Sequence, residues 1–81
     1  MLHIIYTEAE VLLSKRKWTS WQEIQDAVPG YKASLGPWAS AETVQFLRDE
    51  YGDLRPTAET QVRALEASAE ETMALTFDEP R

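Results

Sequence analysis

The sequence has no cysteine and a single histidine, His3. Without cysteine the chain cannot form a disulfide, a thiolate metal site or a cysteine nucleophile. One histidine beside an apolar run lacks the paired spacing of a zinc site, and no neighbouring residue marks it as part of a catalytic triad. The sequence also lacks a glycine-rich phosphate motif and an EF-hand loop. We therefore expect no enzymatic activity, no cofactor and no bound metal.

Long hydrophobic runs are missing as well. No apolar stretch approaches the roughly 18 residues that a membrane-spanning helix requires. Residues 1–6 are mostly apolar, but they are too few for the core of a signal peptide and no basic residue precedes them. Together with the lack of cysteine, these features favour a cytoplasmic protein that does not enter a membrane.

Basic residues are scarce relative to acidic ones. The chain has eight Lys and Arg against fourteen Asp and Glu, which gives a net charge of −6. Residues 1–38 carry four of each sign, whereas residues 39–81 carry four arginines against ten acidic side chains. An acidic surface is repelled by phosphate backbones and anionic lipids. We therefore expect nucleic-acid binding to be unfavourable and a basic protein partner to be favoured.

The apolar residues that are present follow helical spacing. The 81 residues suffice for one small domain. Helical periodicity occurs in four segments: residues 2–18, 20–28, 40–52 and 57–75. Ser20, Ser40 and Thr57 are suitable N-caps for the last three. We predict an all-α domain of four helices over residues 1–75, with the first helix central, followed by a loose C-terminal tail at residues 76–81.

The faces of these helices predict a hydrophobic core. Its expected members are Ile5, Leu12, Leu13, Trp21, Ile24, Val44, Leu47, Val62 and Leu65. The first segment also carries a competing signal, because Thr7 and Glu10 fit a capping box that would leave residues 2–6 extended. The alternative fold is therefore α+β, with a small sheet in which residues 74–77 pair with residues 3–6.

The stretch "VPGYKASLGPWAS", residues 28–40, interrupts the helical pattern with two glycines and two prolines. It is longer than most connections between packed helices. We expect Tyr31, Leu35 and Trp38 to fold back over the core as a lid. The functional alternative is an aromatic binding loop.

One aromatic residue lies off its helix's apolar face. Phe46 lies about 140° from the centre of the apolar stripe in residues 40–52 at 100° per residue, among Glu42, Asp49 and Glu50. An apolar anchor with an acidic rim suits a basic partner. The structural alternative is that Trp38 or the C-terminal tail covers Phe46.

A second acidic feature is the aligned row Glu59, Glu66 and Glu70, which could occupy a site meant for phosphates. The sequence thus favours a small protein-binding module that regulates or inhibits a larger basic or nucleic-acid-handling protein. Its candidate partner-binding residues are Tyr31, Trp38, Glu42, Phe46, Asp49, Glu50, Glu59, Glu66 and Glu70. An assembly protein, including a homo-oligomer, is the structural alternative.

The order of the segments at residues 20–28 and 40–52 resembles a helix-turn-helix domain, which would imply DNA binding. The connection of about ten residues is longer than the usual turn of three or four. The segment that would read DNA is acidic, with Arg48 as its single cation. DNA binding is therefore the alternative function; its basic contacts would come from Lys15, Arg16 and Lys17.

Overall fold

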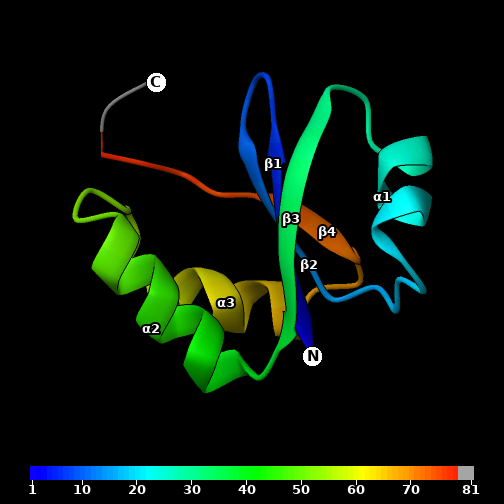
Figure 1. The fold of residues 1–81 in the computed structure, drawn as a ribbon. Coiled ribbons are helices and arrows are strands. Elements are labelled where there is room, and N and C mark those ends of the chain that lie inside the picture. Colours follow the sequence, from blue (N-terminus) through cyan, green and yellow to red (C-terminus); the bar gives the residue numbers. More distant parts are fainter. Residues whose placement is uncertain (79–81) are drawn as a thin grey trace.

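The computed structural model describes residues 1–78, and within them the chain forms one four-stranded sheet and three helices (Figure 1). The elements are β1 (Leu2–Thr7), β2 (Val11–Ser14), α1 (Trp21–Ala27), β3 (Tyr31–Trp38), α2 (Ser40–Glu50), α3 (Ala58–Ala67) and β4 (Thr72–Ala74). The strands lie in the order β3-β1-β2-β4, and every neighbouring pair is antiparallel. The fold class is α+β, and the prediction of an all-α four-helix bundle is wrong.

The first predicted helix is replaced by the β1–β2 hairpin. β1 lies between β3 and β2, and its residues from Leu2 to Ile5 are all buried. Successive side chains of a strand point to opposite faces. Ile4 packs in the core cluster with Leu47 and Leu65, whereas Ile5 is fully buried outside that cluster. A strand that is covered on both faces has a continuous run of apolar residues. Read with helical spacing, such a run gives two apolar stripes, and this is why a helix was predicted here.

Thr7 closes the turn of this hairpin. Its Oγ1 accepts hydrogen bonds from the amides of Ala9 and Glu10, at 3.2 and 3.0 Å. The Thr7 amide donates to the carbonyl of Glu10 at 3.0 Å. Thr7 therefore accepts hydrogen bonds from nearby amides, as a capping residue does. These bonds close a turn between two strands, however, and do not begin a helix.

The stretch expected to be a lid is the edge strand β3. It pairs with β1, with Leu35 opposite Ile4 and Ala33 opposite Tyr6. The pairing is irregular near Gly36, whose φ is +110°. A Cβ at that position would lie 2.5 Å from the carbonyl oxygen of Leu2, so only glycine fits. The lid prediction is wrong, although Leu35 and Trp38 do pack against the core.

The helices α1 and α2 confirm two of the predicted segments. Ser20 caps α1 by accepting a hydrogen bond from the Glu23 amide at 3.3 Å. The N-cap of α2 is Ala39 instead of Ser40, and the Glu42 carboxylate accepts from the Ala39 amide at 3.3 Å. Glu42 therefore binds the orphan amide that precedes its own helix.

The last predicted helix is shorter than its periodicity suggested. Thr57 caps α3 as predicted, but the helix ends at Ala67, and the chain then returns as β4 beside β2. The Lys15 ammonium donates to the carbonyls of Leu65, at 2.8 Å, Glu66 and Ser68. These are carbonyls that a longer helix would have used, so a lysine from the β2–α1 connection takes over the C-terminal cap.

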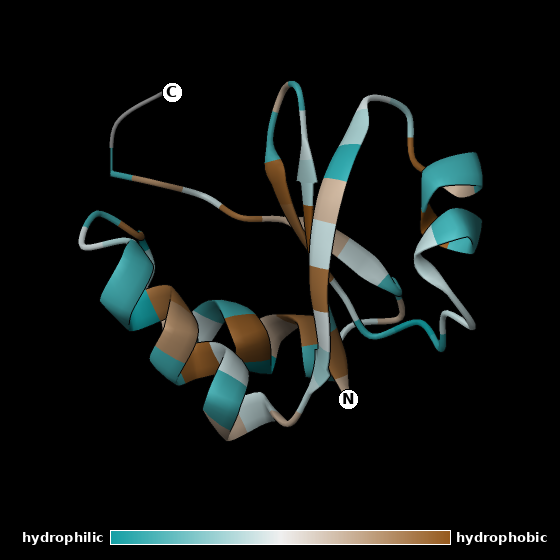
Figure 2. Cartoon of the chain, in the orientation of Figure 1, coloured by the Kyte–Doolittle hydropathy of each residue, from teal (hydrophilic) through white to brown (hydrophobic). Residues whose placement is uncertain are grey.

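The sheet separates two layers of unequal size. Helices α2 and α3 cover one face, and α1 lies beside β3 on the other side (Figure 1). Brown hydrophobic segments alternate with teal hydrophilic ones along α2 and α3, and the β1–β2 hairpin is partly brown (Figure 2). Of the predicted core, the buried members are Ile5, Leu13, Ile24, Leu47, Val62 and Leu65. Leu12 and Val44 are half-buried. Trp21 is 55% exposed, so its assignment to the core is wrong.

Part of the predicted C-terminal tail contacts the domain. Phe77 forms an isolated bridge with Leu54, and its ring lies 5.5 Å from that of Tyr51. The Asp78 carboxylate lies 2.7 Å from Arg55. Residues 79–81 of that tail fall outside the described residues. In the described part of the chain, no helix is both long enough and apolar enough to cross a membrane.

Candidate functional site: an aromatic groove on α2

A shallow groove of about 590 Å³ runs along the exposed face of α2. It is lined by Trp38, Ala41, Glu42, Gln45, Phe46 and Asp49. Residues three or four apart on a helix lie on the same face, so the five residues from α2 form one continuous surface. β3 ends at Trp38, and Ala39 alone separates it from α2, so this short connection places the indole beside the first turns of the helix.

Two aromatic rings form the apolar part of the groove. The centroids of Trp38 and Phe46 lie 5.2 Å apart, with an interplanar angle of 60°. Tilted pairs at this separation are a favourable arrangement for aromatic rings. Both side chains are half-buried and pack against the core cluster with one side. Phe46 is therefore neither free in solvent nor sealed inside the domain: one edge supports the core and another lines the groove.

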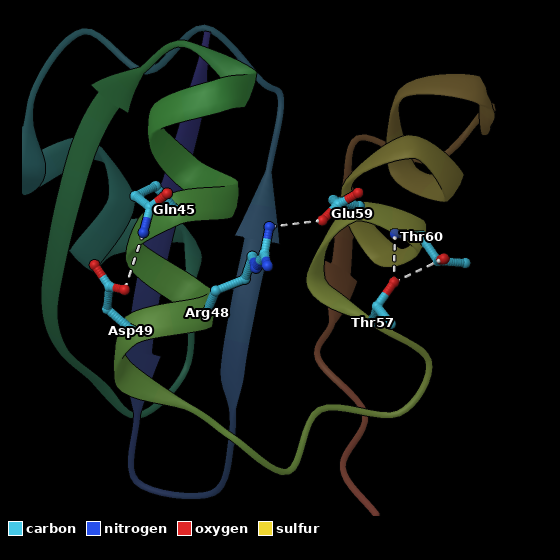
Figure 3. Close-up of polar contacts among 6 residues, drawn as sticks. All are labelled: Gln45, Arg48, Asp49, Thr57, Glu59 and Thr60. Atoms are coloured by element: carbon cyan, nitrogen blue, oxygen red, sulfur yellow. Dashed lines mark hydrogen bonds and ion pairs between the residues drawn. The ribbon is translucent and has the colours of Figure 1, made fainter.

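Two carboxylates flank these rings, and each is oriented by a hydrogen bond. Asp49 Oδ1 accepts from Gln45 Nε2 at 2.9 Å (Figure 3), and Glu42 accepts from the amide that precedes α2. Within residues 1–78 the ion pairs are Arg48–Glu59 and Arg55–Asp78. Neither carboxylate of the groove has a cationic partner among these residues, so their negative charge remains available to a ligand.

The one cation on α2 is directed away from the groove. Arg48 Nη1 lies 3.1 Å from Glu59 Oε1, and this ion pair links α2 to α3 (Figure 3). The two side chains are 62% and 51% exposed, so solvent screens the pair and its contribution to stability is small. The ion pair matters for the charge of the groove. Because Arg48 partly neutralises Glu59 on α3, it does not neutralise the carboxylates of the groove, which stays acidic.

Of the predicted partner-binding residues, the structure brings Trp38, Glu42, Phe46 and Asp49 together. Glu50 lies elsewhere on α2, beside Tyr6: burial raises the pKa of Tyr6, and Tyr51 and then Glu50 raise it further. Glu50 is thus close enough to Tyr6 of β1 to affect its pKa, and it is not among the residues that line the groove.

The remaining candidates are scattered over the surface. Tyr31, at the other end of β3 from Trp38, has its hydroxyl 3.0 Å from that of Ser34. Glu66 accepts a hydrogen bond from the Ser40 hydroxyl. Glu70 lies beyond the end of α3, so the acidic row expected along one helix does not continue past Ala67.

Two residues of the groove were missed by the sequence analysis, which selected aromatic and charged side chains. Ala41 and Gln45 precede Asp49 in steps of four, and this spacing alone places them on one helix face. The small side chain of Ala41 leaves space beside Trp38, and Gln45 orients Asp49. Helical spacing relative to Asp49 was the signal that could have found both.

No cluster that could hold a metal ion, meaning three or more His, Cys, Asp or Glu side chains, occurs among residues 1–78. Searches against protein-family models, curated proteins and solved structures found no significant match to this chain. The case for a function therefore rests on the chemistry of the groove itself.

Proposed function

We propose that this chain is a protein-binding module whose α2 groove holds an apolar side chain of a basic protein partner. The observation that supports the proposal is the pairing of the Trp38–Phe46 rings with two oriented carboxylates, Glu42 and Asp49, that have no cationic partner among residues 1–78. Aromatic pockets supply most of the affinity at protein interfaces. Charges at the rim steer the approach of an oppositely charged partner.

The chemistry of the groove also indicates which side chains fit it. An arginine can lay its guanidinium on an aromatic ring and donate hydrogen bonds to a carboxylate, so the groove can hold it by both groups at once. A leucine or aromatic residue between two basic residues would use the rings and the carboxylates separately. By occupying such a segment, the chain would regulate or inhibit the protein that carries it.

The helix-turn-helix alternative finds less support. In a DNA-binding pair the two helices are joined by a short turn. Here the whole strand β3 separates α1 from α2, and the two helices lie on opposite sides of the sheet (Figure 1). The exposed face of α2 carries the acidic groove, which would repel phosphates.

The proposal is tested with a short peptide in which a leucine is flanked by arginines, titrated into the isotopically labelled protein. We expect the largest NMR shift changes at the Trp38 indole and at the amides of Gln45 and Phe46. The double variant Glu42→Lys/Asp49→Lys should weaken binding by roughly tenfold or more, because it reverses both rim charges.

A matched control separates the effect of the groove charges from the effect of the net charge. Glu8→Lys/Glu10→Lys changes the net charge by the same amount at the β1–β2 turn, outside the groove, and should leave peptide binding nearly unchanged. A second peptide with glutamates in place of the arginines should not bind. Equal loss of binding in both double variants, or shifts spread evenly over the surface, would contradict the proposal.

A further inference from the structure

The α2 groove contains a hydrogen-bond donor that the fold itself does not use. No acceptor within residues 1–78 takes a hydrogen bond from the Trp38 indole Nε1–H, and this nitrogen remains accessible to solvent. The indole of Trp18, by contrast, donates to Ser14 Oγ at 3.1 Å. A tryptophan combines an apolar ring with this single polar donor. Trp38 can therefore pack its ring on a ligand and donate to a carbonyl of the same ligand.

The spacing of the two groove carboxylates is set by the helix. Glu42 and Asp49 are seven residues apart on α2, so they lie on nearly the same face and about 10.5 Å apart along the helix axis. Glu42 Oε1 accepts from the Ala39 amide, and Asp49 Oδ1 accepts from Gln45 (Figure 3). Both side chains turn toward the N-terminus of the helix, so their carboxylates keep a similar spacing. The second oxygen of each carboxylate has no partner among residues 1–78 and can accept from a ligand.

The charges around the groove favour a basic ligand. α2 carries three carboxylates and a single cation, Arg48. Arg48 is directed to Glu59 of α3, away from the groove (Figure 3). At the start of α2 the Ser40 hydroxyl donates to Glu66, which brings a further carboxylate of α3 to this end of the helix. A ligand that lies along this face therefore meets a net negative charge.

The spacing and the free donor together select the conformation of a peptide ligand. In a polyproline II helix every third side chain returns to the same side after about 9.3 Å, which is close to the spacing of the carboxylates. In a β-strand the side chains of one face recur after about 6.7 Å, which is too short. An α-helix can present two side chains about 10.5 Å apart, but its interior carbonyls are already hydrogen-bonded and cannot accept from the Trp38 indole.

The composition of the ligand follows from the way the groove is built. It is lined by side chains of one helix and by Trp38, so it offers no strand edge to the main-chain N–H groups of a ligand. Proline has no such N–H group, and its ring fixes the backbone near the polyproline II conformation before binding. Grooves lined by aromatic side chains bind proline-rich segments in this way.

We propose that the α2 groove binds a proline-rich segment of a partner protein in the polyproline II conformation, with two basic residues three positions apart. The basic side chains would contact Glu42 and Asp49, and the prolines between them would pack on Trp38 and Phe46. A main-chain carbonyl of the segment would accept from the Trp38 indole. This inference rests on the proposed function, since it names the class of ligand for the same groove.

The test compares two capped peptides of identical composition, each titrated into the labelled full chain and followed by NMR. Pro-Arg-Pro-Pro-Arg-Pro has its arginines three positions apart, whereas Pro-Arg-Pro-Arg-Pro-Pro has them two apart. The first should bind roughly tenfold more tightly, because both of its arginines can reach a carboxylate. The Trp38 indole proton should move downfield as it forms a hydrogen bond. Equal affinities of the two peptides would overturn the inference.

The contribution of the indole donor is measured with a variant that keeps an aromatic ring. Trp38→Phe should weaken binding of the first peptide by roughly three- to tenfold, because it removes the N–H. Trp21→Phe makes the same change at an exposed tryptophan outside the groove and should leave binding unchanged. Circular dichroism shows whether each variant is folded. If Trp38→Phe is not, Glu42→Gln/Asp49→Asn takes its place and should abolish the difference in affinity between the two peptides.

Two further results would contradict the inference. One is a folded Trp38→Phe variant that binds the first peptide as tightly as the wild type does. The other is tighter binding of a helix-stabilised peptide that has arginines seven positions apart and a leucine between them, because such a ligand offers no free carbonyl to the indole.

The arginine-leucine peptide separates this inference from the proposed function. If that peptide binds in the groove and the proline peptides do not, the polyproline II ligand is wrong and the protein-binding function stands. If none of the peptides binds in the groove, both are wrong.

Discussion

His3 is a titratable side chain placed where a charge is poorly tolerated. It is 7% exposed, and its Nδ1 is buried without a hydrogen-bond partner among residues 1–78. Burial lowers the pKa of His3 below its usual value of about 6.5, and the positive N-terminus lowers it further. The folded protein therefore holds this imidazole neutral, which makes His3 a source of instability in acid.

The sign of the pH effect follows from this lowered pKa. As the pH falls below about 6.5, the unfolded chain binds the proton first, so the free energy of unfolding decreases with falling pH. His3→Leu removes the titrating group, and the difference in stability between the two proteins should change across this window and be constant above it. Urea titrations over a pH series measure the difference. Parallel curves for the two proteins would show that folding leaves the pKa of His3 unchanged, which would contradict its lowering by burial.

At the scale of elements, the end of α3 depends on a side chain from another part of the chain. Lys15→Met keeps the aliphatic stem but leaves the last carbonyls of α3 without their donor. A hydrogen bond to a charged group contributes about 1.5–3 kcal/mol, and we expect a loss of that size in a urea titration. Lys17→Met, on an exposed residue, should change stability by less than about 0.5 kcal/mol. Equal losses in both variants would contradict the capping role.

The dependence on distant residues explains why the sequence predicted some helices correctly and not others. α1 was predicted because its Ser20 cap and its apolar face agree locally. α2 was predicted from the shared face of Val44 and Leu47, although its N-cap is Ala39 instead of Ser40. α3 was overextended because Ala69 and Met73 continue its spacing. These two residues lie outside the helix because Lys15 caps the end of α3 and because β4 pairs with β2, and both partners are distant in sequence. β1 was predicted wrongly as a helix because both of its faces are buried. Its sequence therefore lacks the alternation of apolar and polar residues by which a strand is recognised.

The candidate site was predictable in part for the same reason. Glu42, Phe46 and Asp49 share one correctly predicted helix, so their common face could be read from spacing. Trp38 was known as an aromatic residue before that helix, but its place beside Phe46 depends on β3 leading directly into α2. Glu50 and Glu70 were misgrouped because the packing of Tyr6 and the end of α3 are set by the tertiary structure.

At the scale of the whole molecule, stability is unevenly divided between the two sides of the sheet. The side covered by α2 and α3 contains the main cluster of buried residues, whereas α1 buries Ile24 alone and packs against the edge strand β3. Regions with few buried apolar contacts open at low free energy, and their amides exchange with solvent sooner. The two helical layers should therefore not open together.

Hydrogen exchange measures this division directly. We expect the amides of β1, the strand buried on both faces, to be the most protected, and those of α1 to exchange well before those of α2 and α3. Ile24→Ala should speed exchange in α1 much more than in β1, because Ile24 is the buried contact of that helix. Leu47→Ala, in the main cluster, should instead lower protection throughout the domain and cost roughly 2–4 kcal/mol of stability. Uniform protection of α1 and β1 would contradict the two-layer division, because α1 would then not be the part of the domain that opens first.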